Sequence, residues 1–177
     1  MTTTPPATKS LTAASICSPS RALLALGNAL LIDVESKVGN KKPEGVDTNH
    51  PVFIYGHLAI YPDFVLGAIG RDDLKDPKSA EWHDHFMHGK DCIDCCDQYA
   101  PLNEVRAFWA DRFETVINAV AEADESVFEQ ENPMEGLKSR CATVGEVANF
   151  MLVMHTSFHL GQMSTWRRCM GLGPASL

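Results

Sequence analysis

The chain has 177 residues, a length that suits one domain with a sizeable core. It carries 23 Asp and Glu against 15 Lys and Arg, and the resulting net charge of −8 argues against a nucleic-acid-binding surface. No stretch of about 18 apolar residues occurs, so we predict no membrane span. Nucleic acid and membrane are therefore not expected as partners.

The N-terminal sequence MTTTPPATKSLTAAS lacks a charged segment followed by an apolar one, so we predict no secretory signal. Residues 1–17 are expected to form a flexible tail, residues 18–172 the folded domain and residues 173–177 a short C-terminal tail. Without a signal, the six cysteines favour reduced thiols in a cytoplasmic protein over a disulfide framework.

Two helices are expected in the first part of the domain. Ser18 and Pro19 predict the first helix start, because Ser is a favoured N-cap and Pro suits the first helical position. Gly39 is expected to end this helix. A second helix should begin near His50 and run to about residue 70, with a kink or break at Pro62.

Two further helices follow a long connection over residues 71–100. Pro101 predicts the start of the third helix, which has regularly spaced apolar residues. Thr143 and Glu146 form a capping-box pattern for a fourth helix, which should end at Gly171. We therefore predict an all-α protein, a four-helix bundle with a long crossover between its second and third helices.

Three histidines are candidate metal ligands. His155 and His159 are four residues apart in a helical pattern, so both imidazoles can reach one ion from the same helix face. Apolar residues share that face, so the two rings are expected to point into the core. His57 lies within VFIYGHLAIY, another strongly apolar segment. Three inward histidines from two helices would form an open metal site.

These residues resemble a known family. A histidine in the second helix, followed late in the fourth by H-x3-H-x-G-Q-x4-R-R-x2-G, is similar to the DinB/YfiT-like metalloproteins. The matching residues are His57, His155, His159, Gly161, Gln162, Arg167, Arg168 and Gly171. The resemblance covers most of residues 18–172 and implies a bundle in which His57, His155 and His159 bind a divalent metal with open coordination positions.

The resemblance implies a metal-dependent hydrolase or a thiol-dependent S-transferase that acts on a small molecule, with a low-molecular-weight thiol as one candidate partner. The metal would lower the pKa of bound water or hold a thiolate. Zinc or nickel suits three imidazoles best, with iron as a further candidate. The alternative is a non-enzymatic bundle that binds metal or a small ligand. The resemblance also admits a homodimer.

Other polar residues of the fourth helix have two interpretations each. Gln162 either hydrogen-bonds a ligand or the metal-bound water, or it caps the buried site; as an amide it cannot act as a general base. Arg167 and Arg168 favour the C-terminal end of the helix dipole and are expected to be solvated or to bridge to an acidic loop. His50 lies two turns before His57, too far to share its metal, and is expected to mark the helix start.

The crossover offers a rival metal site. Its candidate ligands for a structural zinc are His83, His85, His88, Cys92, Cys95 and Cys96. Their spacing matches no zinc module, so a polar loop with reduced thiols is the other interpretation. A third is a lid over the histidine site, with an apolar pocket lined by Trp82, Phe86 and Met87.

Overall fold

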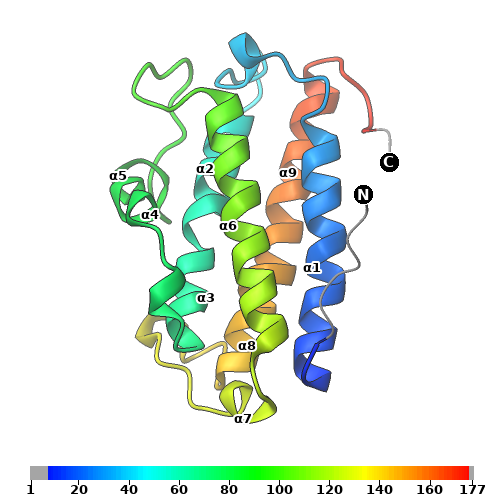
Figure 1. Cartoon of the computed structure of the whole chain (residues 1–177). Helices are drawn as coiled ribbons and strands as arrows, with labels where there is room; N and C mark the ends of the chain where they lie inside the picture. Colours follow the sequence, from blue (N-terminus) through cyan, green and yellow to red (C-terminus); the bar gives the residue numbers. More distant parts are fainter. Residues whose placement is uncertain (1–7, 176–177) are drawn as a thin grey trace.

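A computed structural model of the chain describes residues 8–175 (Figure 1). Within this range the regular elements are helical, and the β structure is limited to one isolated bridge between Glu131 and Thr143. The predicted all-α class is therefore confirmed. Across the same residues, no helix has the length and apolar character needed to cross a bilayer.

The long helices run side by side along the length of the molecule and enclose one apolar core (Figure 1). Contacts join α6 to both α1 and α2, and α9 to the same two helices. Two of the long helices are single elements, α1 (Leu11–Leu30) and α6 (Leu102–Glu122). The other two are made of consecutive elements: α2 (Pro51–Ile60) with α3 (Pro62–Ala68), and α8 (Val144–Asn149) with the π-helical segment η4 (Phe150–His155) and α9 (Thr156–Cys169).

Short helical elements occupy the connections between them. The connection after α3 contains three of these elements: η2 (Asp72–Leu74), α4 (Pro77–Glu81) and α5 (His83–Phe86). The other three are η1 (Ser36–Val38), α7 (Glu125–Phe128) and η3 (Glu135–Leu137).

The first helix begins earlier than predicted. Ser10 is its N-cap, and the Ser10 hydroxyl accepts a hydrogen bond from the Ala13 amide at 3.0 Å. The predicted start at Ser18 and Pro19 is wrong, because Pro19 lies inside α1. Burial explains this, since the turns before Pro19 place apolar side chains in the core: Ala13, Ile16 and Cys17.

Part of the predicted tail is consequently helical. Residues 11–17 belong to α1, whereas residues 1–7 and 176–177 lie outside the described part of the chain. The helix also ends earlier than expected, at Leu30, and Gly39 instead follows the short element η1. The predicted domain limit at residue 172 stays a prediction.

The other helix boundaries agree with their sequence signals. His50 caps α2 by accepting the Phe53 amide on Nδ1 at 3.2 Å. The helix breaks before Pro62, as predicted. Pro101 directly precedes α6, and Thr143 forms a complete capping box with Glu146 at the start of α8.

Helix α2 is buried over its whole length, and this burial fixes the position of His57. All residues from Pro51 to Ile60 are buried, because α2 packs against the long helices α6 and α9 and also against the short elements α4 and α5. Gly56 lets the Phe86 ring of the crossover lie close against α2, because a Cβ at this position would lie only 2.6 Å from that ring. The crossover is thus packed into the core.

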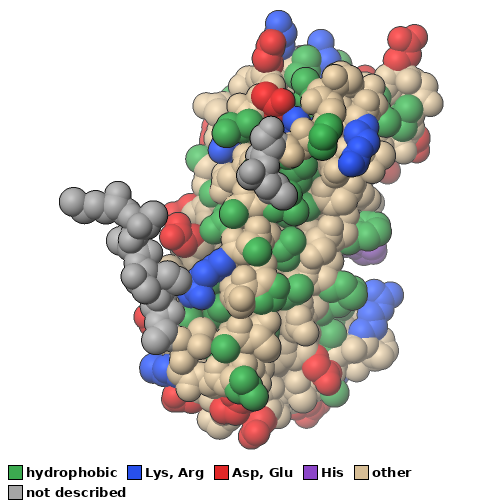
Figure 2. All heavy atoms as spheres, turned by 90° about the vertical axis from the view of Figure 1, so that its right-hand side faces the viewer, with side chains coloured by type: hydrophobic (Ala, Val, Ile, Leu, Met, Phe, Trp, Pro, Cys, Tyr) green, Lys and Arg blue, Asp and Glu red, His purple; other side chains and the backbone are tan. Residues whose placement is uncertain are grey.

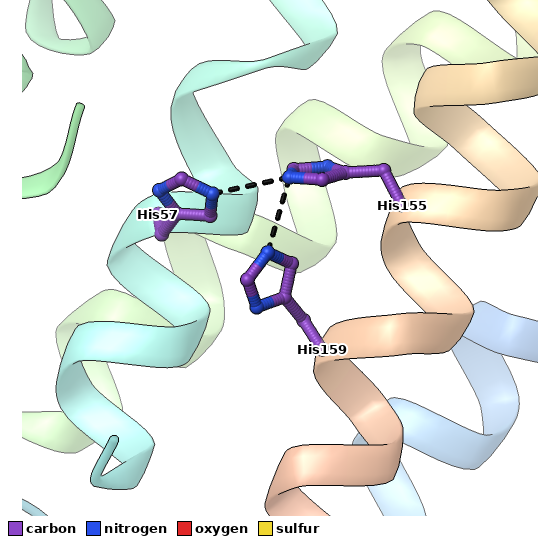
Figure 3. Close-up of side chains that lie close together, drawn as sticks. All are labelled: His57, His155 and His159. Carbon is purple, nitrogen blue, oxygen red and sulfur yellow. Dashed lines mark hydrogen bonds between the residues drawn. The ribbon is translucent and has the colours of Figure 1, made fainter. Parts of the chain in front are cut away.

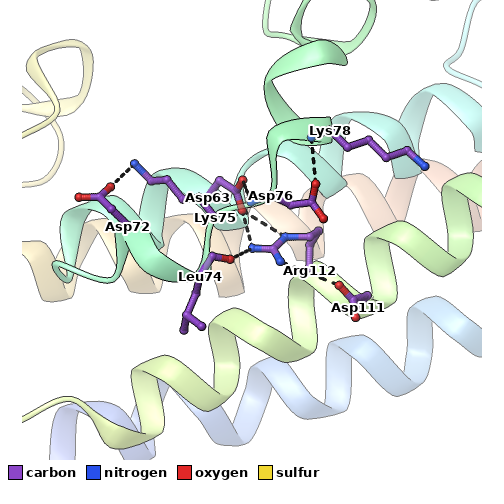
Figure 4. A network of polar contacts seen from close by, with 8 residues as sticks. All are labelled: Asp63, Asp72, Leu74, Lys75, Asp76, Lys78, Asp111 and Arg112. Atoms are coloured by element: carbon purple, nitrogen blue, oxygen red, sulfur yellow. Dashed lines mark hydrogen bonds and ion pairs between the residues drawn. The ribbon is translucent and has the colours of Figure 1, made fainter.

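A buried ion pair joins α3 to α6 beneath the crossover (Figure 4). Arg112 Nη2 lies 2.7 Å from Asp63 Oδ1 and also donates to the Leu74 carbonyl at 2.6 Å. Asp63 Oδ2 accepts the Asp76 amide at 3.0 Å. Both charged groups therefore have partners that offset part of their desolvation cost, and the pair fixes where the crossover leaves α3.

The contact at Gly56 generates a stability prediction. Gly56→Ala should destabilise the protein by about 1–3 kcal/mol, because the added methyl overpacks against the buried Phe86 ring. Gly161→Ala is the matched control: Gly161 is also helical but has open space around it, so the change should be neutral or stabilising by about 0.5–1 kcal/mol. Urea unfolding measures both effects, and equal free-energy changes would contradict the packing argument.

Candidate metal centre

His57, His155 and His159 converge on one point between α2 and the last helix (Figure 3). His155 Nε2 lies 3.1 Å from His57 Nε2 and 3.1 Å from His159 Nε2. Among residues 8–175, this trio is the one group of three or more His, Cys, Asp or Glu residues close enough to share a metal ion. The predicted convergence of these three side chains is therefore observed.

A π-helical segment positions His155. The final helix was expected to be α-helical throughout, but residues 150–155 form the wider turns of a π-helix. The Thr156 hydroxyl donates to the Met151 carbonyl at 3.1 Å, which gives that carbonyl a partner. Short π segments are rare and often occur at functional sites. The sequence FMLVMH contains no Gly or Pro that could have signalled the change.

Hydrogen bonds set the tautomers of two of the rings. His57 Nδ1 lies 2.6 Å from the Phe86 carbonyl, and His159 Nδ1 lies 2.9 Å from Gln162 Oε1. Both oxygens can only accept, so each Nδ1 carries the proton. In the neutral ring, Nε2 then presents a lone pair to the shared centre. Gln162 thus lies behind His159, where it orients the ring.

The shared centre lacks enough protons for its nitrogen atoms. A proton on His155 Nε2 could satisfy only one of the two neighbouring lone pairs, and its buried Nδ1 has no hydrogen-bond partner in the described structure. A cation would satisfy all three Nε2 atoms. Two of the three separations, those from His155 Nε2, are 3.1 Å and fit this, because ligands about 2.0–2.1 Å from zinc lie about 2.9–3.4 Å apart.

Burial keeps the three imidazoles neutral. It lowers the pKa of His57 to about 4 and that of His155 to about 3, with a smaller lowering from the neighbouring histidines. Burial also lowers the pKa of His159, partly offset by its hydrogen bond to Gln162. All three rings are therefore neutral near pH 7, which is the form that binds metal.

The three histidines face a cleft of about 680 Å³. His57 is only 6% exposed, whereas His155 and His159 are half-buried, so the pair on the last helix reaches the cleft and is not sealed in the core as expected. Apolar and aromatic side chains form much of the wall, among them Phe64, Met87, Met134, Leu137, Phe150 and Phe158. A small molecule that entered would meet the histidines directly.

Tyr61 was not singled out from the sequence, although its spacing offered a signal. It follows His57 by four residues, and its ring centroid lies 4.7 Å from that of His57 and 4.8 Å from that of His155. Its hydroxyl accepts the His88 amide at 3.2 Å. The Phe86 carbonyl was also missed, because the sequence alone cannot show which main-chain atom faces a side chain.

The crossover does not assemble the rival metal site. His83 stacks on Phe64, and His85 packs against Phe86 and Tyr99. All six cysteines of the chain are free. His88 joins the cleft wall but not the metal-type cluster.

The expected pocket lining over the histidines is correct for one residue of three. Met87 lines the cleft. Trp82 and Phe86 instead pack in the core, where Trp82 meets Phe108 with ring centroids 4.8 Å apart. Their large apolar surfaces favour burial, and they anchor this part of the crossover in the core.

The two arginines of the motif have different environments. Arg167 is buried and bridges to Asp33 after α1, while also donating to the Leu30 carbonyl at 2.8 Å. Arg168 is exposed and contacts Ser164. The first therefore bridges to an acidic loop and the second is solvated, which are the two roles expected from the sequence.

No protein-family model, curated protein or solved structure matches this chain. The conclusions about the site therefore rest on its own geometry.

The lowered histidine pKa values predict acid sensitivity of the metal-free protein. An unfolded histidine has its ordinary pKa near 6.5, so between that value and the folded pKa the unfolded chain binds more protons. Stability should be intact above about pH 6.5 and fall toward about pH 4, with His57 alone contributing on the order of 3 kcal/mol.

Urea unfolding of metal-free protein at about pH 7 and about pH 5 measures this loss. The His155→Gln variant should lose less stability between the two conditions, because it lacks one of the shifted groups. His85→Gln, outside the cluster, is the control and should behave like the parent. An identical loss in the parent and the His155 variant would contradict the assignment.

Proposed function

We propose that His57, His155 and His159 bind a divalent transition metal, with zinc or nickel preferred and iron as a further candidate. The observation that supports this most directly is the convergence of three Nε2 atoms. In the His57 and His159 rings the proton is on Nδ1, which donates to a carbonyl oxygen, so Nε2 is free to bind metal. Neutral imidazoles suit ions of this borderline class.

The proposal includes membership of a DinB-like family of four-helix bundles with a long crossover. It is supported by the all-helical architecture and by the side-by-side packing of the long helices (Figure 1). The positions of the three histidines on the second and last of these helices support it as well. The same resemblance is the reason to propose a homodimer. A cytoplasmic location is proposed from the six free cysteines.

We further propose that the protein is a metal-dependent enzyme, either a hydrolase or a thiol-dependent S-transferase, acting on a small molecule. The cluster offers three protein donors and faces a cleft, which is the arrangement of catalytic metal sites more than of structural ones. When bound, the metal would supply Lewis acidity toward a substrate oxygen or sulfur.

The chain's own residues would orient and shield that centre. The Phe86 carbonyl and Gln162 hold the His57 and His159 rings. The Tyr61 ring covers two of the imidazoles, and Phe150 stacks near His155 with centroids 6.3 Å apart. Both aromatic residues also line the cleft, so they would place apolar surface beside the cluster where a ligand enters.

A non-enzymatic metal- or ligand-binding protein is the second candidate, and one observation favours it. None of the described residues that line the cleft is an Asp or Glu, so no carboxylate is positioned there as a general base. An activity screen of zinc-loaded protein on ester, amide and alkyl-halide substrates, with and without a thiol cosubstrate, separates the two candidates. Turnover that disappears in His159→Ala supports the enzyme.

Metal binding should depend on the histidines and not on the crossover cysteines. Both His155→Ala and His159→Ala should abolish stoichiometric zinc binding, because two remaining imidazoles hold a metal weakly. Cys95→Ala should keep full stoichiometry, since Cys95 is exposed and outside the cluster. Elemental analysis after dialysis measures the zinc content. Retention in the histidine variants with loss in the cysteine variant would place the metal in the crossover.

Gln162 should tune the metal affinity. Gln162→Ala removes the acceptor that holds the His159 Nδ1 proton, so the zinc affinity should fall about 10- to 100-fold. Gln98→Ala, an exposed glutamine in the crossover, is the control and should leave the affinity unchanged. Competition against a fluorescent zinc chelator measures both. An unchanged affinity in Gln162→Ala would show that the hydrogen bond does not support the ligand.

A further inference from the structure

The cleft over the histidines carries positive side chains and no negative ones. Lys90 lies in the crossover after α5, and Arg140 lies in the connection before α8, so two separate segments each bring one cation to the wall. No Asp or Glu belongs to the described lining, although the chain as a whole has a net charge of −8. The charge of the cleft is thus opposite in sign to that of the protein.

Neither cation is neutralised by its surroundings. Within residues 8–175, the side chains of Lys90 and Arg140 make no ion pair, and both residues are exposed. Lys138 gives a local comparison, because it lies two residues before Arg140 but pairs with Glu131 at 3.2 Å and Glu135 at 2.6 Å. The two cleft cations therefore remain available to a ligand.

The cluster at the base of the cleft adds to this charge, on the basis of the proposed metal binding. Three neutral imidazoles leave both positive charges of a divalent ion uncompensated, and the lining supplies no carboxylate to offset them. With a metal bound, an anion would find three cationic partners along one cleft.

The remaining walls favour an apolar body. Phe64, Phe150 and Phe158 contribute aromatic rings, and Met87, Met134 and Leu137 contribute flexible aliphatic surface. Phe158 is 64% exposed, so a ligand body that covered it would remove apolar surface from water. The volume of about 680 Å³ suits a small organic molecule.

Figure 2 shows the side of the protein on which α1 and α9 lie, where hydrophobic side chains and charged side chains of both signs are interspersed. The histidine cleft differs in that its described lining combines two unpaired cations with no Asp or Glu.

We propose that this cleft binds a small carboxylate with an aromatic or aliphatic body, and that Lys90 and Arg140 select for its negative charge. The carboxylate pairs with these side chains and with the metal, while the body packs against the phenylalanine and methionine walls. Arg140 can hold a carboxylate with two parallel hydrogen bonds, and Lys90 acts as a point charge.

Calorimetric titration of zinc-loaded protein with phenylbutyrate and with the neutral phenylbutyramide tests this proposal. The carboxylate should bind at least about tenfold more tightly than the amide, because a charge-assisted pair is lost in the amide. The double variant Lys90→Gln/Arg140→Gln should lose most of that preference. Lys138→Gln, which removes a neighbouring but already paired cation, should keep it. Zinc content measured on each sample shows that the variants remain folded and loaded.

The outcomes separate this proposal from the proposed metal binding. Equal affinity for acid and amide, binding of neither, or a preference that survives in the double variant would each overturn the carboxylate proposal. Absence of zinc from the parent protein would overturn the metal proposal alone. In that case the same titrations on metal-free protein decide the matter: a preference for the acid that depends on Lys90 and Arg140 supports the carboxylate site, and its absence rejects it.

Discussion

The packing of the crossover against α2 is the contact on which the histidine cluster depends. Gly56 lets the Phe86 ring lie directly on the helix, and the carbonyl of Phe86 then accepts a hydrogen bond from His57 Nδ1 at 2.6 Å. One residue of the crossover therefore both seals the core and sets the tautomer of a candidate ligand. The Asp63–Arg112 pair fixes the chain at the start of the same segment. The geometry of the site is thus set by packing outside it as much as by the histidines themselves.

The π-helical segment is the second constraint, and it acts on the other side of the cluster. A π turn is less favourable than an α turn, so its six residues need compensation from packing. Met151 and Leu152 provide it, since they are 5% and 1% exposed and belong to the core. The wide turns end at His155, directly before the α-helical turn that carries His159. The backbone change therefore coincides with the stretch of the helix that lines the cleft, which runs from Phe150 to His159.

Local signals and side-chain spacing could be predicted from the sequence, whereas effects of tertiary packing could not. His50, Pro62 and the Thr143 capping box act within one helical turn, so their roles follow from neighbouring residues alone. The spacing of His155 and His159 likewise identified the cluster. The start of α1 was missed because burial of residues upstream of Pro19 outweighs the cost of a proline inside the helix. The Phe86 carbonyl and the π segment depend on contacts between distant parts of the chain.

Burial and access make opposing demands on the three histidines, and the structure meets both with one arrangement. Burial lowers their pKa values, so near neutral pH a metal would not compete with protons for the rings. The same burial costs stability once the rings must be protonated in acid. Complete burial would also block exchange with solvent and substrate. His57 takes the buried position on α2, while His155 and His159 lie half-buried at the edge of the cleft. This division gives three neutral imidazoles that are open on one side, and the charge of an ion held there would face a molecule that enters the cleft.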